Sequence, residues 1–249
     1  MIASLPMYDR PETAAANDRL WQGVRERLGQ GPEHLTRGGD LWAQWQSPDL
    51  ILSQTCGLPY RARLHGRVNL VATPVCDLPD CPDGHYCSVF VARADDPRAD
   101  VRDFAGTVLA YNEPLSQSGW AAPQAFAAAH GLAFGPTLRT GAHALSARAV
   151  AEGRADIAAL DALTWRMIAR HDGFARDLRV IGRTDPTPAL PYITAAGRDP
   201  APIRAALSDA LAALSARDRD TLGLRGMTRL SEESYLALPI PDPPAADLG

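Results

Sequence analysis

The chain has no long apolar run and no excess of basic charge. None of its 249 residues lies in a stretch approaching the roughly 20 apolar residues that a membrane-spanning helix needs. The formal net charge is −4, with an isoelectric point near 5.8, which gives no support to nucleic-acid binding. Residues 1–8 are typical of a strand and lack the basic and apolar segments of a signal peptide. We expect either that the protein is not exported by a standard signal or that its signal is missing from this sequence.

Catalytic and metal-binding signatures are also absent. The chain contains no Gly-x-Ser-x-Gly elbow, no His-Glu-x-x-His motif and no glycine-rich nucleotide loop. Its 4 cysteines are not spaced as a pair of Cys-x-x-Cys zinc ligands, so disulfides rank above zinc. Reduced thiols are the plain alternative in a cytosolic protein. We therefore expect no metal and no cofactor. The cysteines are Cys56, Cys76, Cys81 and Cys87.

The chain does contain an alternation of strands and helices. Its composition, 46% hydrophobic, is that of a globular protein long enough for one large domain or two lobes of ~100 residues. Short apolar runs alternate with helical segments, which predicts an α/β fold with mainly parallel sheets. The predicted strands span residues 49–53, 68–72, 86–92, 155–160, 178–181 and 192–195.

Two irregular stretches, residues 94–97 and 183–188, interrupt this alternation. A chain that leaves one lobe and later returns to it forms two lobes around a cleft, with the polar turns at strand ends facing one another. We therefore expect lobe 1 to comprise residues 1–93 and 186–249 and lobe 2 to comprise residues 94–185, with hinges near 92–96 and 183–188. The tail from Pro239 on is rich in proline and aspartate, and we expect it to be loosely ordered.

One polar turn lies between a predicted strand and a predicted helix. Residues 107–110 are β-prone, residues 111–120 are mostly polar, and residues 121–130 are alanine-rich and helical. Ser116 and Ser118 would lie at the helix N-terminus, where the first N–H groups lack intrahelical partners and the dipole favours negative charge. Such a terminus can hold an anion. Taken by itself, the turn is explained more simply by ordinary N-capping.

Several segments, taken in order, resemble a known family. They are Ser-Leu-Pro-Met-Tyr at 4–8, Leu-Ser-Gln-Thr-Cys-Gly-Leu-Pro-Tyr at 52–60, Tyr-Cys-Ser-Val-Phe-Val at 86–91, and residues 112–119, 140–143 and 155–161. With this order and spacing the chain is similar to the phosphonate-, phosphite- and phosphate-type substrate-binding proteins of ABC importers, a branch of the type II periplasmic-binding-protein fold. The resemblance implies two lobes, each a mainly parallel sheet flanked by helices, with a cleft between them.

The same resemblance implies a function. It implies a monomeric protein of the periplasm that has no catalytic activity. This protein would capture a small anionic ligand such as a phosphonate, phosphite or phosphate-like ion. Ligand contacts to both lobes would favour a closed form, which an ABC permease would then bind. Fold-level similarity does not choose among these anions.

The resemblance implies an oxyanion site at the polar turn. Ser116, Gln117, Ser118 and Gly119 would hold the anion through hydroxyl and backbone N–H groups. Family members often carry Ser-Thr-Ser-Gly here, so Gln117 replaces a hydroxyl with an amide. His143, at the start of the next helix, would donate a further hydrogen bond. A solvent-exposed histidine in the first turn of a helix is the alternative.

Other side chains are implied as further contacts of the same site. Asp161 would bind an amine of the ligand, unless it simply caps the helix that follows it. Gln54 and Thr55 would supply polar contacts from the first lobe. The aromatic walls, or alternatively core aromatics, would be Tyr8, Tyr60 and Tyr86.

The resemblance also bears on the cysteines. It implies the disulfide Cys56–Cys81, which leaves Cys76 and Cys87 as a second pair. The two disulfides would pin a proline- and aspartate-rich loop and indicate an oxidising compartment. From the residues alone, the other two pairings of the four cysteines remain open.

Two other functions stay open. A cytosolic ligand sensor of the same fold would need no signal peptide. An enzyme on this scaffold would use His143 with Asp161 or Ser118 as an acid–base pair, although no motif marks a nucleophile. Export separates the importer component from the sensor, and binding without turnover separates it from the enzyme.

Overall fold

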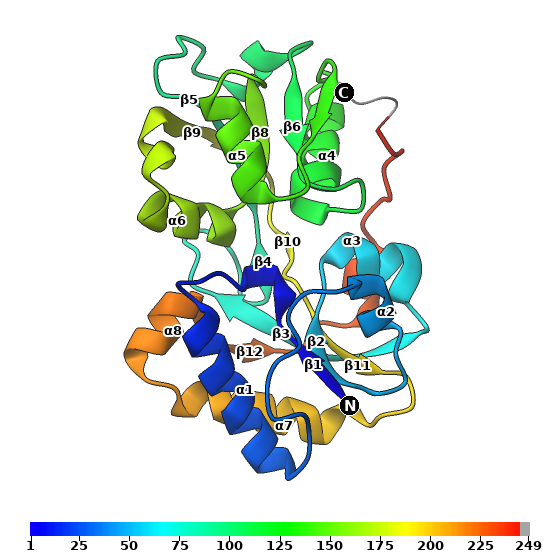
Figure 1. The fold of residues 1–249 in the computed structure, drawn as a ribbon. Helices are drawn as coiled ribbons and strands as arrows, with labels where there is room; N and C mark the ends of the chain where they lie inside the picture. The colour runs from blue at the N-terminus through cyan, green and yellow to red at the C-terminus, as the bar shows by residue number, and fades with distance from the viewer. Residues whose placement is uncertain (245–249) are drawn as a thin grey trace. The chain divides into compact units, whose positions relative to one another are not determined.

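The computed structural model describes residues 1–244, and these form two compact units (Figure 1). Unit 1 comprises Met1–His85 and Pro188–Leu238, and unit 2 comprises Tyr86–Thr187 and residues 239–244. The chain therefore crosses between the units three times. Among the described residues, no helix is long and apolar enough to span a bilayer.

A five-stranded sheet forms the centre of unit 1, in the strand order β1-β2-β11-β3-β12. Its strands are β1 (Ile2–Ser4), β2 (Leu50–Gln54), β3 (Val68–Cys76), β11 (Tyr192–Ala195) and β12 (Leu224–Thr228). Its longer helices are α1 (Ala14–Leu28), α7 (Pro200–Ala213) and α8 (Ala216–Leu222). Its shorter helical segments are η1 (Pro6–Tyr8), α2 (Leu41–Trp45), α3 (Gly57–Pro59), the π-helical turn η2 (Tyr60–Leu64) and α9 (Glu232–Leu236).

Helix α1 shows how the sequence places a helix on this sheet. Leu20, Trp21 and Val24 recur at helical spacing and are all buried. The helix packs against α7, as Figure 1 shows. Gly29 ends the helix, because its φ of 66° lies in the left-handed region that favours glycine and its N–H reaches the Arg25 carbonyl at 2.9 Å. Burial of the apolar stripe therefore holds α1 on unit 1.

Unit 2 is built on a second five-stranded sheet, in the order β7-β6-β8-β5-β9. Its strands are β5 (Ser88–Arg93), β6 (Leu109–Tyr111), β7 (Thr137–Arg139), β8 (Ile157–Asp161) and β9 (Leu178–Arg183). Its helical segments are η3 (Val101–Phe104), η4 (Gln117–Ala121), α4 (Ala122–Ala129), α5 (His143–Ala151), α6 (Ala162–His171) and η5 (Gly173–Asp177). Where the chain crosses between the units, β4 (His85–Tyr86) and β10 (Thr187–Pro188) form a two-stranded pair.

The expected α/β class is confirmed, but both sheets are mixed rather than mainly parallel. In unit 1, β11 pairs antiparallel with β2 and β3. In unit 2, β5 pairs antiparallel with β8 and β9. These are the strands by which the chain enters each unit after a crossing. Two parallel neighbouring strands need a crossover connection between them, usually a helix. β5 and β11 are each reached from the other unit and not through such a connection, so they can run antiparallel to their neighbours.

The first crossing lies earlier in the chain than the expected boundary at residue 93. β5 pairs on both sides with strands of unit 2, so it belongs to that sheet. The turn after it is braced, because the Arg98 guanidinium contacts Asp96 at 2.6 Å and Asp156 at 3.1 Å. The stretch expected as a hinge at 92–96 therefore lies within unit 2. The return crossing, after Thr187, lies inside the expected range 183–188.

The C-terminal segment also departs from expectation. The sequence places residues 239–244 in lobe 1, but in the structure they belong to unit 2. The indole N–H of Trp120, a core residue of unit 2, donates a 2.9 Å hydrogen bond to the carbonyl of Asp242. This contact joins residues far apart in the chain and has no local sequence signal. Residues 245–249, which the same expectation includes, lie outside the described part of the chain.

The structure records no disulfide among the described residues. Cys76 ends β3 of unit 1, whereas Cys87 lies beyond the first crossing, in unit 2. Cys56 directly precedes α3, and Cys81 lies in the turn between β3 and β4. The expected pairs Cys56–Cys81 and Cys76–Cys87 are therefore not formed.

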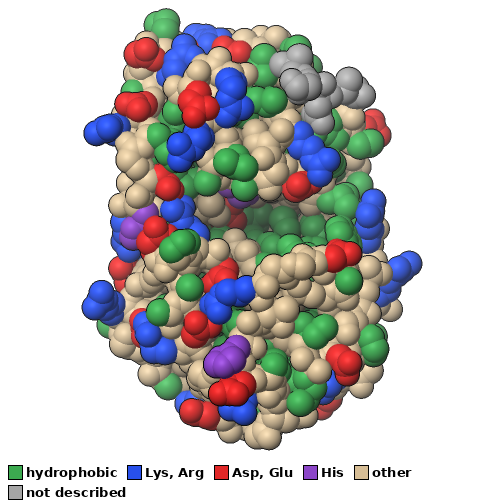
Figure 2. All heavy atoms as spheres, in the orientation of Figure 1, with side chains coloured by type: hydrophobic (Ala, Val, Ile, Leu, Met, Phe, Trp, Pro, Cys, Tyr) green, Lys and Arg blue, Asp and Glu red, His purple; other side chains and the backbone are tan. Residues whose placement is uncertain are grey.

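The basic side chains are all arginine or histidine, since the chain contains no lysine. Figure 2 shows arginine, acidic and hydrophobic side chains interspersed over the viewed face. Several arginines pair with carboxylates of the same unit, such as Arg19 with Asp218 and Arg37 with Asp9. Much of the basic charge is therefore neutralised locally.

Candidate functional site

The polar turn between β6 and η4 is the centre of the candidate site. Ser116 caps the helix that runs without a break through η4 and α4. Its hydroxyl accepts the Gly119 N–H at 2.9 Å. Ser118 lies in the first turn, where backbone N–H groups lack intrahelical partners. Residues 116–119 are all buried. The strand, turn and helix that the sequence predicts here are therefore present.

Gly119 is required by a close approach of the chain to itself. A Cβ at this position would lie 2.0 Å from Asn112 Oδ1 and 3.2 Å from Ser116 Oγ. Any side chain would displace Asn112, whose Oδ1 is buried without a hydrogen-bond partner in the described structure. The glycine therefore allows the first turn to lie close to the end of β6.

Strand β5 braces the turn through Ser88. The Ser88 hydroxyl donates to the Ser118 carbonyl at 3.0 Å. The Ser88 N–H donates to Thr184 Oγ1, also at 3.0 Å. Both Ser88 and Thr184 are buried. The backbone of Ser118 is thus held by a strand that is distant in sequence, which limits the motion of the turn.

A second turn brings His143 beside the first. The Thr140 N–H donates to the Tyr111 carbonyl, and the Gly141 N–H donates to the Asn112 carbonyl, each at 2.9 Å. His143 is the first residue of α5 and directly follows this turn. Because the turn is tied to the two residues that leave β6, α5 begins next to residues 116–119.

Ser118 and His143 form a direct pair, with Ser118 Oγ 2.9 Å from His143 Nε2. Burial lowers the pKa of His143 to about 4, so the imidazole is neutral at pH 7. Its Nδ1 is buried and has no hydrogen-bond partner among the described residues. If Nε2 accepts from the serine, Nδ1–H is the unused donor; if Nε2–H donates, the serine O–H is the unused donor. Either tautomer leaves the pair one donor for a ligand.

These groups suit an oxyanion. Backbone N–H groups of a first helical turn, a hydroxyl and a neutral imidazole can all donate, and the helix dipole favours negative charge at this end. The Ser116 hydroxyl accepts from Gly119 and keeps its own O–H as a donor, and Ser118 and His143 supply a further side-chain donor. The structure therefore brings together the predicted residues 116–119 and His143. The alternative of a solvent-exposed His143 does not fit its half-buried position.

Asp161 acts as a helix cap. Its Oδ1 accepts the N–H groups of Leu163 at 2.8 Å and Thr164 at 3.0 Å, at the start of α6. It lies opposite Ser88 in the ladder between β5 and β8, at the same end of the sheet as the polar turn. Neither ring nitrogen of His143 hydrogen-bonds to it. The pair of His143 with Asp161 that the enzyme hypothesis needs is therefore not assembled.

The pair of Ser118 and His143 also falls short of a catalytic triad. Their separation is that of a nucleophile and its base. A triad needs a third group on the other ring nitrogen to orient the imidazole. His143 Nδ1 bonds to no described residue, so this group is missing.

Gln54 and Thr55 lie at the end of β2 in unit 1. Gln54 Nε2 donates to the Leu190 carbonyl at 3.1 Å, which ties it to the segment leading into β11. The Thr55 N–H donates to the Pro191 carbonyl at 3.0 Å. Both side chains are buried, and Thr55 Oγ1 has no hydrogen-bond partner in the described structure. The amide of Gln54 is thus partly used by the fold, whereas the Thr55 hydroxyl is available.

The three predicted tyrosines are buried. Tyr60 lies in the core of unit 1, with its ring 5.4 Å from that of Tyr235, so its ring is a core aromatic. Its hydroxyl is buried and interacts with Glu232. Tyr8 ends η1 and Tyr86 ends β4. All three are therefore explained as core aromatics by their burial, and a role as walls of a pocket stays a prediction.

Sequence reasoning misses Ser88 and Asn112 as residues of the site. Both lie inside segments that carry the family resemblance, at 86–91 and 112–119. Small polar side chains are ordinary at such positions. Only the folded contacts show that one braces Ser118 and that the other abuts Gly119. Among the described residues, no group of three or more His, Cys, Asp and Glu side chains is placed to hold a metal ion.

A family model matches most of the chain. The model, described as ABC transporter, phosphonate, periplasmic substrate-binding protein, matches residues 49–235. This span contains the polar turn, His143 and the end of β2. No curated protein sequence matches the chain.

Solved structures share the fold at low sequence identity. A binding protein component of an ABC phosphonate transporter from Pseudomonas aeruginosa has a TM-score of 0.72 at 15% identity, over 95% of this chain and 83% of that chain. PhnD1 from Prochlorococcus marinus, in complex with methylphosphonate, has a TM-score of 0.70 at 15% identity, over 94% of each chain. XAC2383 from Xanthomonas citri, bound to ATP, has a TM-score of 0.67 at 19% identity, over 96% of this chain and 94% of that chain. At these sequence identities the similarity shows that the fold is shared, and it shows that alone.

The depressed pKa of His143 predicts a pH-dependent stability. An unfolded histidine titrates near 6.5, whereas the folded imidazole has a pKa of about 4. Between these values the unfolded chain binds the extra proton, so the stability is complete above about pH 6.5 and is lost as the pH falls toward 4. In thermal unfolding, the melting temperature of the wild type should fall more steeply from pH 7 to pH 4.5 than that of His143→Gln. His34→Gln, at an exposed position, serves as the control and should follow the wild type. Parallel profiles for the wild type and His143→Gln would contradict the prediction.

Proposed function

The chain belongs to the family of periplasmic substrate-binding proteins of phosphonate ABC transporters, and we propose that unit 2 binds the anionic group of its ligand at residues 116–119 together with His143. The observation that carries this proposal is the pair of Ser118 and His143, 2.9 Å apart at the first turn of a helix. The pair has a donor that no protein group uses, and the helix terminus favours negative charge.

A phosphonate is the ligand class we propose. Its tetrahedral oxyanion accepts several hydrogen bonds at once, which suits a turn rich in N–H and hydroxyl donors. The fold shared with PhnD1, whose structure contains methylphosphonate, supports the same class. Gln117 stands where family members often have a hydroxyl residue, so we expect an amide contact there.

Unit 1 is proposed to supply further contacts. The hydroxyl of Thr55 is buried without a hydrogen-bond partner among the described residues, so it can bond to a ligand at no cost to the fold, and Tyr60 is proposed as a second contact. Gln54 adjoins Thr55 at the end of β2. Tyr8 and Tyr86 complete the proposed set as apolar walls, and Asp161 remains a candidate for an amine only through lone pairs not used in capping.

The remaining properties follow from the same proposal. We propose a monomer that acts without catalysis, that works in the periplasm and that delivers its ligand to an ABC permease. The family is one of periplasmic transport components, which supports this assignment.

Ligand contacts from both units would favour a closed form, with bending at the crossings after His85 and Thr187. Small-angle scattering should therefore give a smaller radius of gyration with saturating methylphosphonate than without it. Ser118→Ala at the same ligand concentration serves as the control and should change less. Superimposable wild-type curves with and without bound ligand would count against closure.

The ligand site is tested by calorimetry with methylphosphonate. Loss of one hydrogen bond to a charged group costs ~1.5–3 kcal/mol, so Ser118→Ala should weaken binding about tenfold or more. His143→Ala should weaken it by a similar factor. Ser208→Ala, on the half-exposed face of α7 in unit 1, should bind as the wild type does. Wild-type affinity in both Ser118→Ala and His143→Ala would show that the site lies elsewhere.

A further inference from the structure

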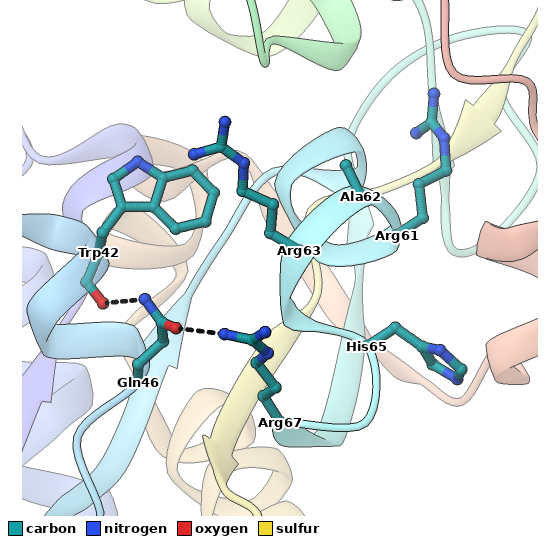
Figure 3. A pocket seen from close by; sticks show the side chains of 7 residues that line it. All are labelled: Trp42, Gln46, Arg61, Ala62, Arg63, His65 and Arg67. Carbon is teal, nitrogen blue, oxygen red and sulfur yellow. Dashed lines mark hydrogen bonds between the residues drawn. The ribbon is translucent and has the colours of Figure 1, made fainter.

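A hollow on the surface of unit 1 is lined by basic side chains. It has a volume of about 510 Å³ and contains none of the residues assigned to the ligand site (Figure 3). α2 and the π-helical turn η2 supply most of its wall. The lining residues are Trp42, Gln46, Arg61, Ala62, Arg63, His65 and Arg67.

A second hollow of about 430 Å³ continues from the first, because Gln46 and Arg67 line both. Its other wall is formed by the segment that follows β11, including Gly197 and Arg198. None of the residues lining either hollow is acidic. We name the two hollows together the arginine groove.

Two guanidinium groups of the groove are held in place before any ligand arrives. The Arg63 guanidinium lies over the Trp42 ring, 5.2 Å from its centroid. The Arg67 guanidinium donates to Gln46 Oε1 at 3.1 Å, and Gln46 Nε2 donates to the Trp42 carbonyl at 3.2 Å. Figure 3 shows Arg63 and Arg67 on the same side of η2 as Trp42 and Gln46, whereas Arg61 and His65 point away from them. Each held guanidinium keeps most of its N–H donors unused.

Three arginines of the groove are not neutralised by carboxylates of the described chain. In the described chain, no carboxylate lies within ion-pair distance of Arg63, Arg67 or Arg198, unlike arginines elsewhere such as Arg19. Arg198 Nε is buried and has no hydrogen-bond partner there. His65, which also lines the groove, contacts Glu232 at 3.2 Å. Uncompensated arginines on a chain of net charge −4 indicate a local site for negative charge.

We propose that the arginine groove binds a small multivalent oxyanion, such as a polyphosphate or a polycarboxylate. One anionic group would lie between Arg63 and Arg67, where two planar forks can bind its oxygens. A second anionic group would lie in the neighbouring hollow, between Arg67 and Arg198. A single small anion reaches only one of the two hollows, so valence and length together set the specificity. Charged arginines, rather than neutral hydroxyl and imidazole donors, distinguish this groove from the site on unit 2.

Tripolyphosphate is the probe, titrated by calorimetry into the full chain at low salt. The proposal predicts saturable binding with one ligand per chain and weaker binding as sodium chloride is raised. Arg63→Gln/Arg67→Gln should lose at least tenfold in affinity. Arg225→Gln/Arg229→Gln removes the same charge from exposed positions of unit 1 and should keep the wild-type affinity. Orthophosphate should bind the groove at least tenfold more weakly than tripolyphosphate.

The site on unit 2 provides an independent check. Ser118→Ala should leave tripolyphosphate binding unchanged, and Arg63→Gln/Arg67→Gln should leave methylphosphonate binding unchanged. Absence of saturable tripolyphosphate binding would overturn the proposal. Equal losses in the groove and control variants would also overturn it, because they would show an effect of net charge alone. A loss of tripolyphosphate binding only in Ser118→Ala would assign the probe to unit 2 and refute the groove.

Discussion

The first turn of an α-helix leaves N–H groups without partners, and unit 2 is arranged around one such turn. Ser116 satisfies one of these groups, and Gly119 lets the turn lie close against Asn112. Ser88 holds the Ser118 carbonyl from β5. The turn that begins α5 is tied to the end of β6, which places His143 on the Ser118 hydroxyl. The sheet therefore serves to hold a small set of donors at fixed directions, as pre-organised binding requires.

The donors at this turn are neutral, which makes anion binding there less sensitive to salt. Burial keeps the His143 imidazole uncharged near pH 7, and the other groups are hydroxyls and backbone N–H. Salt therefore weakens the binding of an anion to neutral donors in a buried turn less than it weakens binding to exposed charges. The arginine groove of unit 1 has the opposite design, with Arg63 and Arg67 presented on the surface. The two surfaces would therefore select anions by different means, one by hydrogen-bond geometry and the other by valence.

Local signals in the sequence predict the polar turn well, because a cap, a glycine and an alanine-rich helix are neighbours in the chain. The α/β class and the return crossing near residue 187 follow from the same kind of reading. Local sequence signals do not predict contacts between residues that are far apart in the chain. The pairing of β5 with β8 and β9 assigns it to unit 2, and the hydrogen bond from Trp120 to Asp242 ties residues 239–244 to the same unit. The capping role of Asp161 was visible as an alternative, but only the fold shows its bonds to the backbone.

The central claim is that residues 116–119 and His143 hold the anion. Crystals grown with methylarsonate, an analogue of methylphosphonate, test it directly through the anomalous scattering of arsenic. The account predicts one strong arsenic peak in unit 2, with its oxygens within hydrogen-bond distance of Ser118 Oγ and the His143 ring. An arsenic peak at full occupancy that lies away from both side chains would contradict it.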